Sequence, residues 1–179
     1  MPALESRIYA LIVDERRKLD PKAQFLSLDP ELVAIARKRS IGMALRNSFA
    51  SDDPHASATM LMAEDAKFQG LIGENVAAQH FTPGAGIDVD AVAQRFVESW
   101  LASAPHKENL GFAEYDRTGV GATANRDTIY VTQLFSTDLG LGPYSDSAPP
   151  SQAAPVASPQ KGKDDNQKVP LRGDIAPGG

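Results

Sequence analysis

Gly73-Glu74-Asn75-Val76-Ala77 is the stretch from which the fold can be worked out. A glycine, a carboxylate and an amide lead into a short apolar run, which is typical of a turn followed by a half-buried strand. Two helical patterns precede this stretch, and a third helical pattern and a hairpin pattern follow it. We therefore expect this strand to lie in the middle of the core.

Helical spacing of apolar residues predicts the helices around this strand. Two are expected before it, at residues 4–19 and 30–47, and a short third one at 56–68. Asp29-Pro30 marks the second start, because aspartate caps helices and proline suits the first helical position. The clearest apolar stripe predicts a further helix at 89–104.

Arg39 lies on the apolar stripe of the second helix. This stripe has the spacing of one helix face and consists of Leu32, Ile35, Ala36, Arg39 and Met43. Two interpretations of Arg39 remain open. Its aliphatic stem can cover apolar surface while the charged head reaches water, or its guanidinium can pair with a buried or half-buried acid.

Residues 118–135 predict a β-hairpin. Two strand-like runs, 118–124 and 128–135, flank a compact polar turn, Asn125-Arg126-Asp127. Gly119 and Gly121 would leave room for another backbone or side chain to come close to the first strand.

Composition predicts one soluble domain followed by a tail. The chain has 179 residues, of which 42% are hydrophobic and 23% are charged, as in ordinary globular proteins. Residues 142–179 hold seven of the thirteen prolines and almost no large apolar group. Such a segment cannot bury enough surface to offset its ordering entropy. We therefore expect a domain at 1–141 and a disordered tail or linker at 142–179.

Charge and cysteine content exclude several classes of protein. The formal charge is −5, and the tail contains four basic and four acidic residues, so the folded part carries the whole charge. An acidic domain argues against a nucleic-acid interface and against attraction to an anionic membrane. The absence of cysteine excludes disulfides and cysteine-based zinc sites. No apolar run approaches the about 20 residues that span a bilayer.

Several short motifs follow one another in a fixed order along residues 4 to about 138. They are Ile12-Val13-Asp14-Glu15-Arg16, the run from Leu26 to Ala36, Gly73-Glu74-Asn75-Val76-Ala77, the string from Trp100 through Ser103, His106 and Asn109 to Leu110, Gly119-Val120-Gly121, and Tyr130-Val131-Thr132-Gln133-Leu134-Phe135. In this order they resemble the CAP superfamily of cysteine-rich secretory proteins, wasp-venom antigen 5 proteins and plant pathogenesis-related proteins. The domain is also called the SCP domain, and its bacterial members are the most similar.

The resemblance implies an α+β fold, a three-layer α-β-α sandwich in which helices cover both faces of a small antiparallel sheet. It also implies structural roles for the motif residues Gly73, Asn75, Trp100, Asn109 and Gln133. Finally, it implies export to an extracellular or periplasmic location. No signal peptide is visible after Met1, so the chain is expected to be either cytosolic or a mature form from which the signal was removed.

The resemblance further implies the position of a metal site. Many eukaryotic members hold a divalent metal with two histidines and two glutamates, a donor set that suits zinc. The four matching positions here are Arg39, Glu74, Ser103 and Tyr130, so one ligand of four remains. Arginine cannot act as a ligand and repels a cation. We expect no metal and no cofactor, and an Arg39–Glu74 pair in the place of the metal.

The three histidines are expected to be structural or exposed. His55 and His80 lie in loop-like segments, and His106 follows the third long helix, where its imidazole could cap backbone carbonyls. A Ser/His/Asp triad built from Ser103 and His106 is disfavoured, because these residues are only one helical turn apart and nothing activates the serine.

The leading interpretation is an exported binding module without catalytic residues. It would be a monomer that holds a small apolar ligand or an envelope protein at a central cleft, without binding nucleic acid. The cleft would be lined by Arg39, Glu74, Ser103, His106 and Tyr130. Two alternatives remain: a protease-like hydrolase that uses this cleft, and a structural module of the cell envelope with the tail as a tether.

Overall fold

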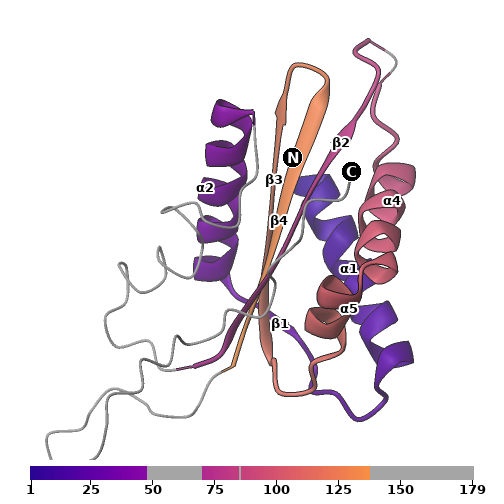
Figure 1. Ribbon diagram of the computed structural model, residues 1–179, viewed down its shortest axis with the longest axis vertical. Coiled ribbons are helices and arrows are strands. Elements are labelled where there is room, and N and C mark those ends of the chain that lie inside the picture. The colour runs from indigo at the N-terminus through magenta and orange to yellow at the C-terminus, as the bar shows by residue number, and fades with distance from the viewer. Residues whose placement is uncertain (48–69, 85, 138–179) are drawn as a thin grey trace, which may run out of the picture.

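The computed structural model of the chain describes residues 1–47, 70–84 and 86–137 (Figure 1). The helix predicted at 56–68 and the tail predicted at 142–179 lie outside the described residues. The described helices are α1 (Pro2–Leu19), α2 (Pro30–Arg46), α4 (Val89–Ala102) and α5 (Ala104–Gly111). The strands are β1 (Ser27–Leu28), β2 (Ile72–His80), β3 (Arg117–Asn125) and β4 (Thr128–Ser136).

These elements form three layers. Figure 1 shows α2 on one face of the sheet and α1, α4 and α5 on the other. The strand order is β1-β3-β4-β2; β3 and β2 both pair antiparallel with β4, whereas the two-residue β1 pairs parallel with β3. Strand β2 therefore lies at an edge of the sheet, and its expected position in the middle of the core is wrong. The α+β sandwich predicted from the sequence is confirmed, and β1 makes its sheet mixed rather than purely antiparallel.

The larger hydrophobic core lies between the sheet and the layer of α1, α4 and α5. Phe96 and Trp100 of α4 and Phe135 of β4 are completely buried there. A smaller cluster joins α2 to the opposite face of the sheet through Leu32, Ile35, Ala36 and Leu134. Both amphipathic stripes predicted for these helices therefore face the sheet, as their spacing requires.

Helix α2 rests directly on β3 because two glycines of the strand carry no side chain. A Cβ atom on Gly121 would lie only 2.2 Å from the backbone nitrogen of Arg37. One on Gly119 would lie 2.3 Å from the backbone carbonyl carbon of Leu32. The expectation that these glycines admit another backbone is confirmed.

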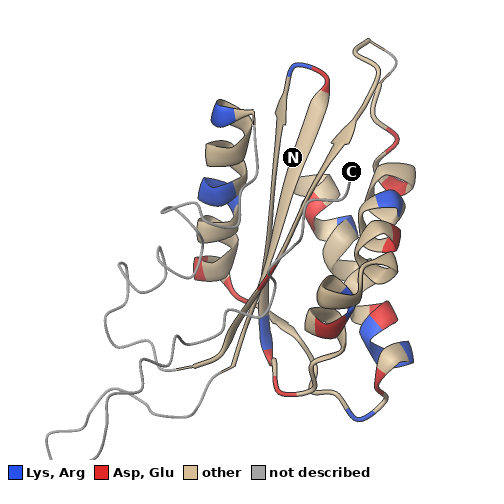
Figure 2. Cartoon of the chain, in the orientation of Figure 1, with Lys and Arg blue, Asp and Glu red and all other residues tan. Residues whose placement is uncertain are grey.

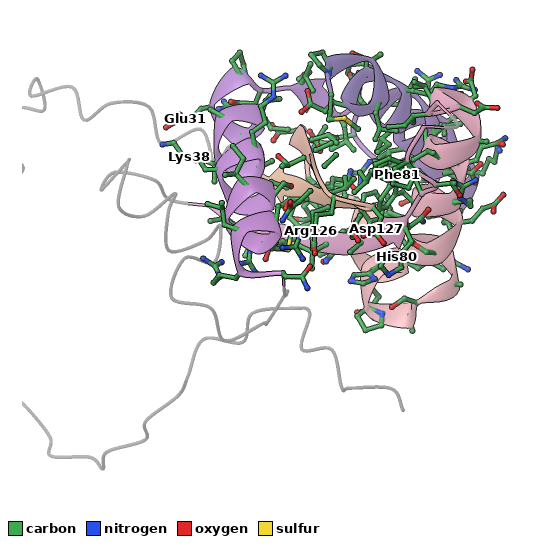
Figure 3. The ribbon with its side chains drawn as sticks, turned by 90° about the horizontal axis from the view of Figure 1, so that it is seen from above. Glu31, Lys38, His80, Phe81, Arg126 and Asp127 are labelled. Atoms are coloured by element: carbon green, nitrogen blue, oxygen red, sulfur yellow. The ribbon has the colours of Figure 1, made fainter. Side chains whose placement is uncertain are left out.

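The β3–β4 hairpin closes at Arg126 and Asp127, as predicted. Arg126 adopts the left-handed conformation with φ 54°. The backbone N–H of Phe81, just after β2, donates to Asp127 O at 2.8 Å. Figure 3 shows His80 and Asp127 next to each other at this end of the sheet. The imidazole of His80 is exposed, as expected, but the residue is the last one of β2 and does not belong to a loop.

A second short helix, α5, follows where the sequence predicts only the end of a helix. Ser103 leaves the helical conformation, with φ −98° and ψ 120°, and ends α4 while it begins α5. Pro105 then lies in the first turn of α5, where its missing N–H costs nothing.

Charges of both signs alternate on the outer helices. Figure 2 shows acidic and basic residues interspersed along α1 and α4. No helix within the described ranges is long and apolar enough to cross a membrane.

Candidate binding site

Arg39 and Glu74 form an ion pair between α2 and the edge strand β2. Arg39 Nε lies 3.3 Å from Glu74 Oε1. The arginine side chain is 1% exposed and the glutamate side chain is 26% exposed. Figure 3 shows Glu31 and Lys38 on the outer side of α2, away from the sheet. Of the two interpretations of Arg39, the structure therefore shows the ion pair.

Tyr130 lies on the same face of the sheet, farther along β4. Its hydroxyl donates a hydrogen bond of 2.7 Å to Asn47 Oδ1, just after α2. Its ring belongs to a small apolar cluster whose other members are Met43, Ala44, Val76 and Ala78. An apolar surface thus continues from the ion pair along β2 and β4.

Ser103 and His106 belong to the other helical layer. Consecutive strand residues point to opposite faces of a sheet. Glu74 contacts Arg39 of α2, whereas the Asn75 side chain donates to the carbonyl of His106 in α5 at 3.2 Å. The structure therefore places Arg39 and Glu74 on one face of β2, and Ser103 and His106 in the layer behind the other face.

The side chain of His106 differs from its expected role. It lies in the first turn of α5, shortly after the end of α4 at Ala102. The imidazole makes no hydrogen bond to any residue that the structure describes, and the backbone carbonyl of His106 is the group used instead. Burial lowers the pKa of His106 from its usual 6.5. The expected capping of carbonyls by the imidazole is wrong.

Side chains of α4 and α5 form hydrogen bonds with the edge strand β2. Asn109 Nδ2 donates to Glu74 O at 3.1 Å and to Asn75 Oδ1 at 3.0 Å. Trp100 Nε1 lies 3.4 Å from Val76 O. The two helical side chains therefore form hydrogen bonds with backbone carbonyls on the outer edge of β2. No strand pairs with β2 at that edge among the described residues.

Close packing explains why residue 73 is a glycine and why Gln133 is fully buried. A Cβ atom on Gly73 would lie 2.5 Å from the hydroxyl oxygen of Tyr115, so only glycine leaves that ring its place. Gln133 is fully buried, and its Nε2 lies 3.5 Å from Thr118 Oγ1. Its Oε1 has no hydrogen-bond partner among the described residues.

The donor set around Glu74 does not fit a metal of the kind the family holds. The neighbour of its carboxylate is the Arg39 guanidinium, a permanent cation that cannot be a ligand. Tyr130 and Ser103 stand at two further ligand positions, and the Tyr130 hydroxyl is directed to Asn47. Within the described ranges, no three side chains of His, Asp or Glu come together as ligands.

Arg16 is a key residue to which the sequence analysis assigned no role. The residue is 2% exposed, and its guanidinium donates to four backbone carbonyls. The distances are 3.1 Å to Gln24, 2.9 Å to Leu110, 3.2 Å to Ala113 and 2.7 Å to Tyr115. It joins α1 to the end of α5 and to both connecting loops. Its position four residues after the buried Ile12, on the apolar stripe of α1, is the signal that could have identified it.

Glu5 is the second such residue. Its buried carboxylate accepts the backbone N–H of Ala122 at 3.0 Å and is paired with Arg37 of α2. Burial would raise the pKa of Glu5, but the hydrogen bonds from Arg37 and Ala122 outweigh it and lower the pKa below 4.5. Glu5 therefore connects α1 to α2 around the edge of β3.

Three of the solved structures that are similar to this chain are bacterial proteins. An outer surface protein of Borrelia burgdorferi is 23% identical with a TM-score of 0.58, over 72% of this chain and 88% of that one. An extracellular SCP-domain protein of Bacillus anthracis is 26% identical with a TM-score of 0.56, over 75% and 40%. A cysteine-rich secretory protein of Staphylococcus aureus is 20% identical with a TM-score of 0.55, over 76% and 39%. The chain thus spans less than half the length of the last two proteins.

The family itself follows from the sequence match. No curated protein matches the chain. The sequence profile described as the cysteine-rich secretory protein family, or CAP, matches residues 12–135, which is most of the part that the structure describes. Although it contains no cysteine, the chain belongs to the CAP family.

Proposed function

We propose that the chain is an exported, non-enzymatic CAP protein that binds a small apolar ligand at a cleft beside the Arg39–Glu74 pair. An extracellular location is supported by the descriptions of the similar proteins, one of which is an outer surface protein and another an extracellular protein. An envelope protein is the other kind of partner that this cleft could hold.

The buried Arg39 guanidinium on the Glu74 carboxylate is the observation that carries this proposal. Glu74 is the one residue of the four family ligand positions that could still bind a metal. The guanidinium of Arg39 neutralises its charge and forms a hydrogen bond with it. A metal-bound water, which a zinc hydrolase requires, therefore has no ligand set on which to form. What remains at this position is a rigid polar anchor without a nucleophile.

An apolar surface beside this anchor supports the ligand class. Val76 and Ala78 are half-buried on the face of β2 that looks toward α2, and Tyr130 lies next to them. Apolar walls with a few fixed polar groups are the usual composition of small-molecule sites. Ser103 and His106 take no part in this proposal, because they belong to the helical layer behind the other face of β2.

Zinc titration tests the loss of the metal site. We expect no calorimetric signal for zinc with the wild-type protein, and measurable binding after Arg39→His and Tyr130→His are combined, because both positions share the α2 face of the sheet with Glu74. Zinc binding by the wild-type protein that disappears in Glu74→Gln would overturn this part of the proposal.

Native mass spectrometry of the protein purified from its source tests the ligand. We expect an additional mass on the wild-type protein that is lost in Ala78→Glu, because a carboxylate on the cleft face of β2 opposes an apolar group. Gln79→Glu is the matched control, since it places the same charge one residue away on the opposite face. A wild-type protein without any additional mass would contradict a resident ligand.

A further inference from the structure

Strand β3 has no partner strand beyond Thr118 at the outer edge of the sheet. Strand β1 covers this edge only as far as Thr118, whose carbonyl accepts the N–H of Asp29 at 2.9 Å. Four residues later, the Ala122 N–H donates to the Glu5 carboxylate. Backbone groups of alternate residues point to the same edge, so those of Val120 point outward between these two contacts.

The outward N–H and C=O of Val120 are therefore a free donor and a free acceptor side by side. No hydrogen bond from any described residue reaches them from that edge. Val120 is nevertheless only 1% exposed. Buried backbone groups are almost always paired, and an unpaired one calls for a water molecule or a ligand.

A pocket of about 100 Å³ lies over this point of the edge. Tyr9 of α1, Leu28 of β1 and Val33 of α2 form apolar walls, and the Glu5–Arg37 pair is also part of the lining. The volume corresponds to about three water molecules at about 30 Å³ each, which is enough for one small residue. Leu28 is 52% exposed, which leaves an apolar rim at the surface.

We propose that this pocket binds one residue of an extended peptide segment from a partner protein, with a small apolar side chain. A single extended residue presents an N–H and a C=O toward the same side and can exchange both hydrogen bonds with Val120. The segment would pair antiparallel with β3 beyond the end of the parallel strand β1, which is strand addition at a sheet edge. Glu5 and Arg37 neutralise each other, so the chemistry favours a neutral residue. This site lies at the opposite edge of the sheet from β2 and does not depend on the proposed cleft.

The probe for this site is N-acetyl-alanine N′-methylamide, titrated into the full-length ¹⁵N-labelled protein. We expect saturable shifts of the amide signals of Val120, Ala122 and Leu28, with a dissociation constant on the order of millimolar for a ligand of this size. The ester analogue, in which oxygen replaces the alanine N–H, lacks the donor for Val120 C=O. It should bind about tenfold more weakly.

Val33→Phe fills the pocket and should abolish the shifts, whereas Ala34→Phe adds the same ring one residue away on the exposed side of α2 and should leave them unchanged. The ester comparison on the wild-type protein keeps the test valid if Val33→Phe fails to fold. Equal binding of amide and ester would overturn the proposal. So would the absence of any shift of Val120, as expected if water or another part of the chain occupies the edge.

Discussion

Replacement of Arg16 by methionine tests the claim that this residue holds the two connecting loops to α1. Methionine keeps a similar length and apolar stem but has no N–H donor. The four carbonyl groups that Arg16 contacts would lose their donor, and two of these bonds, to Leu110 and Tyr115, are buried.

The expected loss follows from these two buried carbonyls. A buried acceptor that loses its donor costs about 1–3 kcal/mol. Two of them give about 2–6 kcal/mol, and the partly buried carbonyls of Gln24 and Ala113 regain part of their bonding from water. We therefore expect a loss of about 3 kcal/mol or more in the free energy of unfolding, which is a large part of the about 5–15 kcal/mol typical of a domain.

Urea unfolding, followed by tryptophan fluorescence of the buried Trp100, measures this loss. With a slope of about 2 kcal/mol per molar urea, the midpoint should fall by about 1.5 M. Arg17→Met is the matched control: its side chain is exposed, and a change within about 0.5 kcal/mol is expected. Arg16→Lys should lie in between, because an ammonium group cannot reach all four carbonyls at once. Stability of Arg16→Met within about 1 kcal/mol of Arg17→Met would refute the reasoning.

Four further predictions concern packing and pH. Gly121→Ala should lower the thermal midpoint, with a cost of about 1–3 kcal/mol or more, because its Cβ would meet the backbone of α2. Gly42→Ala in the same helix should be neutral or stabilising by up to about 1 kcal/mol, because only the end of the flexible Arg46 side chain lies near. Glu5→Gln should weaken the loss of stability below pH 4.5, since a carboxyl with a lowered folded pKa stabilises above its unfolded pKa and this contribution is lost as pH falls. His106→Gln should reduce the loss of stability between pH 7.5 and 5.5 in urea titrations, because the lowered folded pKa of His106 makes the unfolded state bind the proton first.

Long periodic elements could be predicted from the sequence, and short ones could not. The stripes of α1, α2 and α4 and the hairpin of β3 and β4 carry enough repeats to define their period. Strand β1 has two residues and α5 has eight, so neither presents a repeating pattern of its own. Both are positioned by tertiary contacts, β1 by its ladder with β3 and α5 by Asn75.

The candidate site was predictable in its residues but not in its geometry. The position of Arg39 on an apolar stripe indicated an inward cation, and the structure identifies its partner as Glu74. The same argument applies to Arg16, which is buried on the apolar stripe of α1. Matching positions to a family identifies residues without telling which side of a strand they occupy. For that reason the predicted cleft groups Ser103 and His106 with Arg39, although they belong to the other layer.

The seating of α2 on Gly119 and Gly121 has a mechanical consequence. Most helices contact a sheet through a layer of packed side chains, which can change their conformation when the helix shifts. Here backbone meets backbone, with α2 near the carbonyl carbon of Leu32 and the nitrogen of Arg37 as the points of contact. There is no layer of side chains at these two points that could yield if α2 were pushed toward β3. In the cleft that we propose, α2 would therefore keep its position, and ligands of different sizes would have to be accommodated by movement of the opposite side.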